Sequence, residues 1–172
     1  MLLEQCANIE EAIQFITTVP HGYCYNYSIT DRSGKSIIVE AAPDRQTIID
    51  ADPLVCTNHF ETESLRDWNR NDVQLQGSLA RKRHVHALLK QDYTTTELFH
   101  HFNDGESPLF FHHYREFFGT LHTVVYVPET LSVMIGIGQN SQPLEFSLEK
   151  HIEGTIQLPR YLEGQIESVS SY

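Results

Sequence analysis

The feature of this sequence that most constrains its fold is a pair of strand-like segments joined by a tight turn. Residues Tyr23 to Thr30 alternate in polarity and are rich in aromatic side chains, which is typical of a β-strand. The next residues, Asp31 to Gly34, have the composition of a turn in which Gly34 is free to adopt a positive φ. Lys35 to Ala41 then returns as a second strand. Because so short a connection joins only antiparallel neighbours, the sequence predicts an antiparallel sheet.

Further strand-like segments extend this pattern on both sides of a helical middle. Most are rich in β-branched side chains and are bounded by turn residues such as Pro43 or Pro128. The predicted strands are Gln46 to Asp50, Leu54 to Thr57, Thr120 to Val127, Leu131 to Gly138 and Leu144 to Leu148.

Helices are predicted where a capping residue precedes apolar residues at helical spacing. Asn8 occupies such a position before a helix that ends near Pro20. Ser78 is the expected N-cap of a helix that continues to Lys90, and a threonine among residues 94–96 caps a third helix. Antiparallel strands with helices between them place the chain in the α+β class.

Composition and charge exclude several classes of function. The 172 residues are enough for one domain with a hydrophobic core. The 12 basic and 23 acidic side chains give a net charge of -11, which argues against a protein that binds nucleic-acid phosphates through a basic face. No apolar run is long enough to span a membrane, and the first residues lack the features of a signal peptide. Together with three unpaired cysteines, this predicts a cytoplasmic protein with neither nucleic-acid nor membrane partners.

The candidate functional site begins where the apolar run Leu54 to Cys56 stops abruptly on Thr57, Asn58 and His59. An unpaired polar group is costly to bury, so these side chains need either hydrogen-bond partners or an opening to solvent. A strand that ends in polar side chains commonly delivers them to a cleft. The sequence therefore marks Asn58 as the first residue to follow.

Cys56 is an alternative candidate, as a nucleophile with His59 as its base. Neighbouring residues along a strand point to opposite faces, and free cysteines are most often buried, so the pattern favours a core position for Cys56. The ten histidines, including the adjacent pairs at 100–101 and 112–113, have no spacing typical of a zinc site. Neither a metal nor another cofactor is therefore expected.

Asn58 and Arg81 form the pair with the clearest chemical meaning. An asparagine amide donates hydrogen bonds to a carbonyl oxygen that gains charge during acyl transfer. An arginine offers a planar fork for a carboxylate or an oxyanion. The alternative, in which Asn58 caps a turn and Arg81 lies in solvent, stays open on spacing alone.

Five segments then occur in a specific order along the chain. They are NIEEAIQFI, YNYSITDRSGKSIIVEAAP, LVCTNHF, GSLARKRHVHALL and FGTLHTVVYVPETLSVMIGIG. Their order resembles the linear-amide C–N hydrolases, the group of acyl-CoA:6-aminopenicillanic acid acyltransferases and choloylglycine hydrolases. The penicillin acyltransferase-like branch is the more similar of the two, and the resemblance extends over residues 1–148.

This resemblance implies an N-terminal-nucleophile hydrolase fold, a four-layer αββα sandwich of mostly antiparallel sheets with flanking helices. In such enzymes a cysteine at the start of the mature chain attacks an amide carbonyl, with its own α-amino group as base. Asn58 matches the family's asparagine at the strand end, and Arg81 matches its arginine near the nucleophile, so both are candidate catalytic residues. His59, Phe60 and Ser78 are the expected substrate-binding residues.

The resemblance also predicts that residues 1–148 are the C-terminal portion of such a domain and that residues 149–172 form a weakly structured or packed tail. The nucleophile would precede the matching segments, so the chain is expected to be inactive alone. Its expected partners are a small-molecule acyl amide and either a missing N-terminal half or a second copy. The alternatives are a non-catalytic binding or regulatory module on the same scaffold, and an enzyme that uses Cys56 or a histidine.

Overall fold

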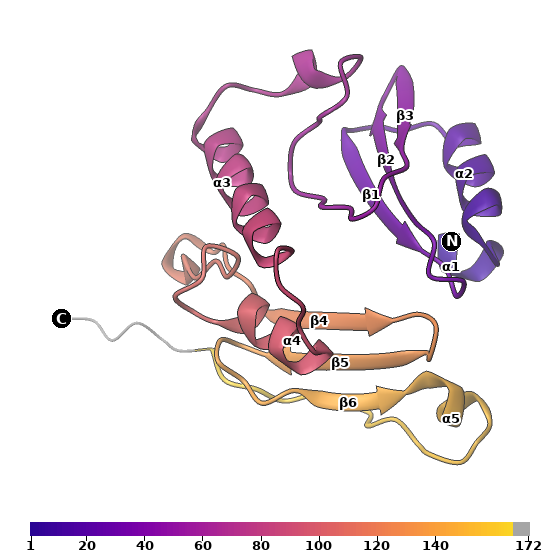
Figure 1. The fold of residues 1–172 in the computed structure, drawn as a ribbon, viewed down its shortest axis with the longest axis vertical. Coiled ribbons are helices and arrows are strands. Elements are labelled where there is room, and N and C mark those ends of the chain that lie inside the picture. The colour runs from indigo at the N-terminus through magenta and orange to yellow at the C-terminus, as the bar shows by residue number, and fades with distance from the viewer. Residues whose placement is uncertain (167–172) are drawn as a thin grey trace. The chain divides into compact units, whose positions relative to one another are not determined.

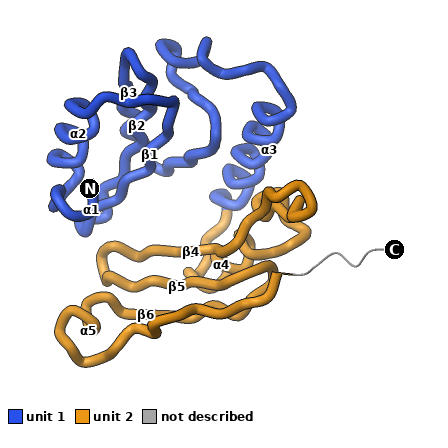
Figure 2. The backbone as a smooth tube through the Cα atoms, turned by 180° about the vertical axis from the view of Figure 1, so that it is seen from behind, with its two compact units in different colours: residues 1–90 blue, residues 91–172 orange. Residues whose placement is uncertain are grey.

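The computed structural model describes residues 1–166 of the chain, which divide into two compact units. The first unit is Met1–Lys90 and the second begins at Gln91 (Figure 2). Each unit contains one three-stranded antiparallel sheet with helices beside it (Figure 1). The α+β class is therefore confirmed, whereas the four-layer sandwich stays a prediction.

The sheet of the first unit has β2 (Ser36–Ala42) in the centre, between β1 (Tyr25–Thr30) and β3 (Arg45–Ile49). The β1–β2 turn contains Gly34 at φ 84°, so the predicted hairpin and its turn glycine are both confirmed. β2 is buried along nearly its whole length, because chain segments cover both of its faces. Its side chains therefore make up the core of this unit.

One face of this sheet is covered by α2 (Ile9–Thr18), which follows the single-turn helix α1 (Leu2–Gln5). The side chains of Ile9 and Ile16 on α2 pack against Ile37 and Val39 of β2, and all four are 0–1% exposed. The Asn8 side chain accepts a hydrogen bond from the Glu11 amide, as the predicted N-cap requires. Burial of one apolar face thus holds α2 on the sheet.

The other face is covered by the segment between β3 and α3, which includes the single turn η1 (Arg66–Trp68). Phe60 and Leu65 of this segment pack against Ala42. The predicted strand at Leu54 to Thr57 is wrong: these residues pair with neither edge of the sheet. The Asn26 side chain of β1 holds the segment instead, so the apolar character of the segment reflects burial rather than strand pairing.

α3 (Val73–Leu88) begins six residues earlier than expected. Asp72 is its N-cap and accepts a hydrogen bond from the Leu75 amide at 3.0 Å. The prediction that Ser78 caps this helix is therefore wrong, since Ser78 lies inside the helix and is fully buried. Asp72 is an equally favoured N-cap residue, and its carboxylate accepts a hydrogen bond from the free amide at the start of the helix. The polar residues around it have no helical pattern from which the start could be recognised.

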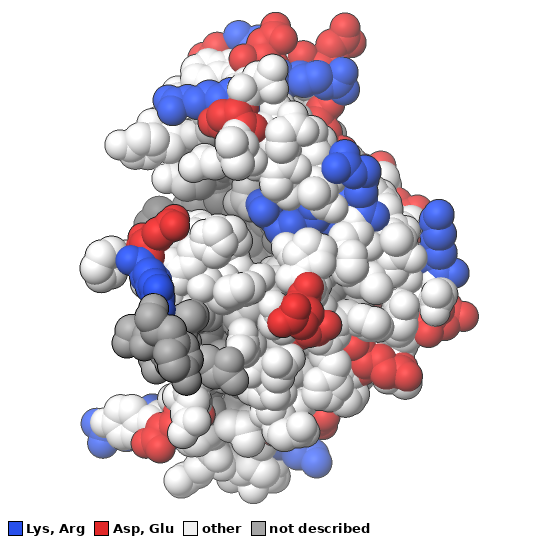
Figure 3. All heavy atoms as spheres, turned by 90° about the vertical axis from the view of Figure 1, so that its left-hand side faces the viewer, with Lys and Arg blue, Asp and Glu red and all other residues white. Residues whose placement is uncertain are grey.

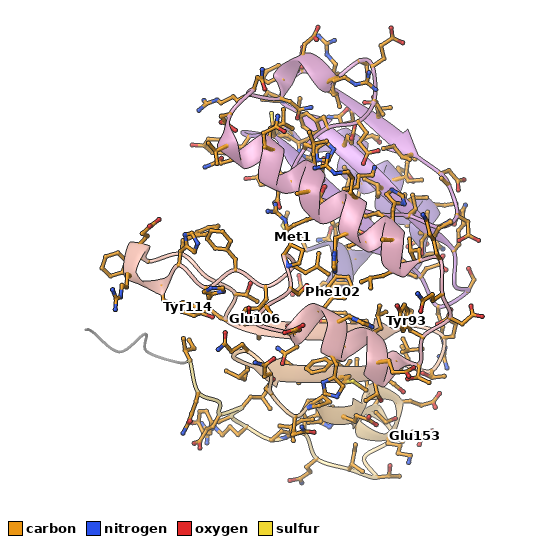
Figure 4. The ribbon with its side chains drawn as sticks, turned by 60° about the vertical axis from the view of Figure 1, so that its left-hand side comes forward. Met1, Tyr93, Phe102, Glu106, Tyr114 and Glu153 are labelled. Carbon is orange, nitrogen blue, oxygen red and sulfur yellow. The ribbon has the colours of Figure 1, made fainter. Side chains whose placement is uncertain are left out.

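The second unit contains the sheet β4 (His122–Val127), β5 (Ser132–Ile137) and β6 (Leu144–Ser147), with β5 in the centre. α4 (Thr95–Asn103) packs on β4, and the short α5 (Leu148–Ile152) follows β6. The single turn η2 (Tyr114–Glu116) lies before β4 (Figure 4). The hydroxyl of Tyr114 donates to the Thr120 carbonyl at 2.6 Å. The predicted hairpin of residues 120–138 is confirmed.

Thr94 caps α4 in a complete capping box with Glu97, as the sequence predicts for one of three threonines. At the other end of α4, the buried Asn103 donates to Thr123 and to the Gly138 carbonyl, and accepts from the amide and hydroxyl of Ser141. Every hydrogen-bonding group of this amide is therefore satisfied, and it ties the helix to the end of β5.

The predicted tail begins within α5, and residues 153–166 contain no further helix or strand. Residues 167–172 lie outside the described part of the chain, so the prediction for that end stays a prediction. Among residues 1–166, no helix combines the length and the apolar character that a membrane span requires.

Candidate functional site

The first unit contains a cleft of about 900 Å³ that opens beside β1 and the segment leading into α3. Asn58, His59 and Phe60, three of the five predicted site residues, are on its lining. The remaining lining residues are Tyr23, Cys24, Tyr25, Asn26, Cys56, Thr57, Trp68, Asn69, Arg70, Asp72, Gln74 and Leu75. Arg81 and Ser78 are not on the lining, and both reach it through hydrogen bonds to lining residues.

Asn26 of β1 holds the backbone on both sides of Asn58. Its side-chain amide donates to the Thr57 carbonyl at 2.7 Å and to the His59 carbonyl at 2.8 Å. These two bonds explain why the segment lies beside β1 without joining its ladder (Figure 1). They fix the position of Asn58, which lies between the two tethered residues.

The structure brings Asn58 and Arg81 together. The Nη2 atom of Arg81, one turn after Ser78 on α3, lies 2.9 Å from Oδ1 of the exposed Asn58. Because a guanidinium only donates hydrogen bonds, it identifies the asparagine atom that faces it as the oxygen. The amide nitrogen of Asn58 is thereby left to donate to another group at the cleft.

His59 is buried, at 8% exposure, and points toward α3. Its Nδ1 lies 2.9 Å from the Ser78 hydroxyl and 3.0 Å from the Thr57 hydroxyl. Burial lowers the pKa of His59 below its ordinary value, although the nearby Glu61 acts in the opposite direction. The neutral imidazole is therefore the form that this position favours near pH 7.

Phe60 is held by Asn69, whose side chain makes two hydrogen bonds to one backbone unit. Asn69 accepts from the Phe60 amide at 2.9 Å and donates to the Phe60 carbonyl at 2.8 Å. The Phe60 ring meanwhile packs into the core with Ala42 and Leu65. Phe60 thus anchors this end of the segment.

One face of α3 binds this segment through three side chains at positions i, i+3 and i+4. Ser78 bonds to His59, Arg81 bonds to Asn58, and Lys82 forms an ion pair with Glu61. Because these three side chains are polar, hydrophobic periodicity does not predict that this face of α3 makes the contact. α3 is therefore positioned at the cleft by hydrogen bonds and charge.

Glu40 is a structural carboxylate that sequence reasoning did not single out. It lies at the centre of β2, is 1% exposed, and accepts hydrogen bonds from the Glu61 amide and from the amide and hydroxyl of Thr62. A carboxylate within the apolar run of residues 37–42 was the available signal, because such a charge requires partners. No feature of the sequence around Asn26 or Asn69 predicts in a comparable way that these side chains bond to distant backbone.

The surroundings of Cys56 disfavour it as a nucleophile. Burial raises the pKa of the Cys56 thiol, and Glu61 and Glu40 raise it further, so the thiolate is rare near neutral pH. The histidine imidazole next to it, His59, points its Nδ1 to Ser78 and Thr57 rather than to sulfur. Within residues 1–166, no group of three or more His, Cys, Asp or Glu side chains is arranged to hold a metal ion.

Comparison with known proteins gives one match. The family model described as acyl-coenzyme A:6-aminopenicillanic acid acyl-transferase matches residues 1–142, which is most of the chain. No curated protein and no solved structure gives a significant match.

Proposed function

The chain belongs to the acyl-coenzyme A:6-aminopenicillanic acid acyl-transferase family, and on that premise we propose that its cleft binds an acyl amide and stabilises the reacting carbonyl. The observation that carries this proposal is the hydrogen bond between Arg81 and Asn58. It leaves the Asn58 amide nitrogen as a donor on the lining of the cleft. The proposed donor is thus fixed before the substrate arrives.

In this proposal Asn58 donates to the carbonyl oxygen of the substrate as that oxygen gains negative charge. Arg81 does not need to touch the substrate, because its guanidinium orients the amide and adds positive charge nearby. A preorganised donor of this kind typically contributes about 10²- to 10³-fold to the rate of acyl transfer. The tethers from Asn26 keep the donor in place, since they hold both neighbouring carbonyls.

The covalent step needs a nucleophile that Cys56 is poorly suited to provide. We propose that a cysteine outside residues 1–172, with its α-amino group as base, supplies it. Its sulfur would attack the carbonyl carbon, the C–N bond would break, and the amine would leave with the proton taken from the thiol. Water or an acceptor amine would then release the acyl group. The chain alone is accordingly expected to bind without turnover.

A missing half of the domain or a second copy of the chain is the proposed partner. β1 and β3 are the edges of the first sheet, and neither has a further ladder partner among the described residues. An edge strand without a ladder partner is a position at which a segment of another chain can pair. Intact mass of the native protein, isolated with an antibody to this chain, tests the point: a co-purifying chain with an N-terminal cysteine supports it, and a lone 19.8 kDa species contradicts it.

The proposed binding is tested directly with N-hexanoylglycinamide, an uncharged acyl amide. Titration into the ¹⁵N-labelled chain should shift the Asn58 side-chain amide and the backbone signals of residues 56–60. Asn58→Ala should remove most of the binding, whereas Asn71→Ala, an exposed asparagine off the cleft lining, should not. Shifts confined to other residues, or no shift at millimolar ligand, would contradict the proposal.

The alternative is a binding module without any catalytic partner. The raised pKa of Cys56 favours it, together with the position of His59, because the His59 Nδ1 bonds to Ser78 and Thr57 and does not serve Cys56 as a base. Mass spectrometry of N-hexanoylglycinamide incubated with the native complex separates the two functions. Release of hexanoic acid supports the hydrolase, and retention of intact, bound ligand supports the binding module.

A further inference from the structure

The second unit contains a separate pocket of about 330 Å³ at the end of β5. β6 pairs with β5 only as far as Leu144 opposite Ile135, so Gly136 and Ile137 extend past the last pair. Residues 139–142, which follow β5, and residues 162–165 complete the walls of this β5 pocket. The β5 pocket shares no lining residue with the cleft of the first unit and is therefore a second candidate site.

Two glycines let residues 162–165 lie directly against the end of β5. A Cβ atom at Gly164 would overlap the side chain of Ile137. A Cβ atom at Gly138, whose φ is 76°, would overlap the Gln165 carbonyl. Because only glycine permits so close an approach of the backbone, the chain that returns to the sheet after α5 (Figure 1) forms a fitted wall of the β5 pocket.

The lining of the β5 pocket combines aliphatic side chains with neutral polar groups and one carboxylate. Its aliphatic residues are Ile135, Ile137, Leu144 and Leu162, and its polar residues are Gln139, Ser141, Gln142, Glu163 and Gln165. Within residues 1–166, the exposed Glu163 is the only charged residue on this lining. The β5 pocket therefore offers apolar surface together with a single negative charge.

From this lining we propose that the β5 pocket binds an aliphatic amine, with the hydrocarbon chain on the four aliphatic side chains and the ammonium group at Glu163. The volume suits a small ligand, since ligand pockets begin at about 300 Å³. An anionic end group meets no cation on the lining and is repelled by Glu163. This inference is independent of the proposed function, because the two sites have no lining residue in common.

The test titrates n-hexylamine, hexan-1-ol and hexanoate into the ¹⁵N-labelled natural chain near neutral pH. n-Hexylamine should shift the backbone signals of residues 135–142 and 162–165. It should bind about threefold more tightly than hexan-1-ol, as an exposed ion pair allows, and hexanoate should bind more weakly than both. n-Butylamine should bind about tenfold more weakly than n-hexylamine, because each buried methylene contributes about three- to fourfold to the affinity.

Two substitutions on the lining, each with a matched control, locate the bound amine. Leu144 is 50% exposed, so Leu144→Ser should keep the fold and weaken every ligand by removing part of the aliphatic surface. Ile152→Ser, an exposed isoleucine off the lining, should leave binding unchanged. Glu163→Gln should abolish the preference for the amine over the alcohol, whereas Glu153→Gln, also exposed and off the lining, should keep it.

A glycine variant tests the wall formed by residues 162–165. Gly164→Ala should push this wall away from β5 and weaken n-hexylamine, whereas Gly22→Ala, where a Cβ meets no atom within 4 Å, should not. Equal affinity for amine and alcohol, or a preference that survives Glu163→Gln, overturns the assignment of an amine. Shifts confined to other residues, or no shift at millimolar n-hexylamine, overturn the β5 pocket as a binding site.

Discussion

Cys24 and Cys56 line the same cleft, yet their thiols have different surroundings. Cys24 is exposed, whereas Cys56 is partly buried and has a pKa raised by burial and by Glu61 and Glu40. Because the thiolate is the reactive form, the partial burial and the raised pKa of Cys56 both make it the slower of the two thiols to react. The two thiols therefore differ in how fast they react with an added reagent. This difference does not make either one a catalytic nucleophile, since no basic side chain among residues 1–166 hydrogen-bonds to either thiol.

We predict that iodoacetamide at pH 8 alkylates Cys24 about tenfold faster than Cys56, because Cys24 is open to the reagent, whereas Cys56 is partly buried and the pKa of its thiol is raised. Peptide mass spectrometry over time measures both rates in one sample. Denatured chain is the control, in which the two rates should converge. Faster labelling of Cys56 in the folded chain would show that an activated thiol exists there.

The lowered pKa of His59 leads to a second prediction, which concerns how the stability of the folded chain depends on pH. Since burial lowers its pKa in the folded chain, the unfolded chain binds the extra proton first as the pH falls. Stability is therefore unaffected by His59 well above pH 6.5 and decreases as the pH drops through about 6.5, the ordinary value for histidine. Urea unfolding between pH 5 and 8 measures the slope.

The matched variant for this prediction is His59→Gln, which removes the titrating group and keeps a polar side chain beside Ser78. It should be less stable than the natural chain at pH 8 and should lose part of the slope below pH 6.5. An NMR titration of the His59 ring gives an independent reading. A ring that gains its proton at or above the ordinary pKa of histidine would contradict the assignment.

At the scale of elements, α3 shows how a helix is placed by polar contacts. It has only one buried side chain, Ser78, and its contacts with the cleft segment come from Ser78, Arg81 and Lys82. A helix with so little apolar burial depends strongly on its capping interactions, because packing contributes little. Its start at Asp72 is therefore important for its stability.

We predict that Asp72→Ala destabilises the chain by about 1 kcal/mol, the usual cost of losing an aspartate N-cap. The loss should appear as faster amide hydrogen exchange in the first turn of α3. Gln76→Ala, on the exposed side of the same helix, is the control and should change exchange little. If both substitutions have equal effects, the helix does not begin at Asp72.

At the scale of the whole molecule, the chain is two compact units, each with its own sheet and core. The polar centre of the second unit is Asn103, whose side chain joins α4 to Thr123, Gly138 and Ser141. Removing a fully bonded buried amide leaves its partners unsatisfied. Such a change reveals whether the units unfold together or separately.

We predict that Asn103→Ala lowers the stability of the second unit by about 2–3 kcal/mol, because several buried groups lose their partners. Hydrogen exchange should rise in β4, β5 and residues 138–141, and should stay unchanged in β1 to β3. Thr96→Ala, an exposed residue of α4, is the control. A matching rise in β1 to β3 would mean that the two units form one cooperative structure.

Charge is also a property of the whole chain. The net charge of -11 follows from composition, and on the face drawn in Figure 3 the basic side chains are scattered among acidic and uncharged ones. An anionic ligand would therefore need a local cation rather than a general field. Arg70, an exposed arginine on the cleft lining, is such a cation.

The sequence by itself determined the features that depend on neighbouring residues. The turn at Gly34, the cap at Asn8, the capping box at Thr94 and the two hairpins all follow from propensities that act within a few positions. Asn58 and Arg81 were also predicted as candidate residues of one site, through resemblance to a family and the chemistry of the two side chains, but the hydrogen bond between them was not predicted. Each of these signals is local or carried by a motif.

Only the tertiary structure decided how the cleft is held together. Asn26 binds backbone carbonyls more than thirty positions away, Glu40 binds amides of Glu61 and Thr62, and Asn69 binds both groups of Phe60. These bonds replaced the strand predicted at residues 54–57. A side chain that bonds to distant backbone needs no particular spacing or period in the sequence, because the fold alone brings donor and acceptor together.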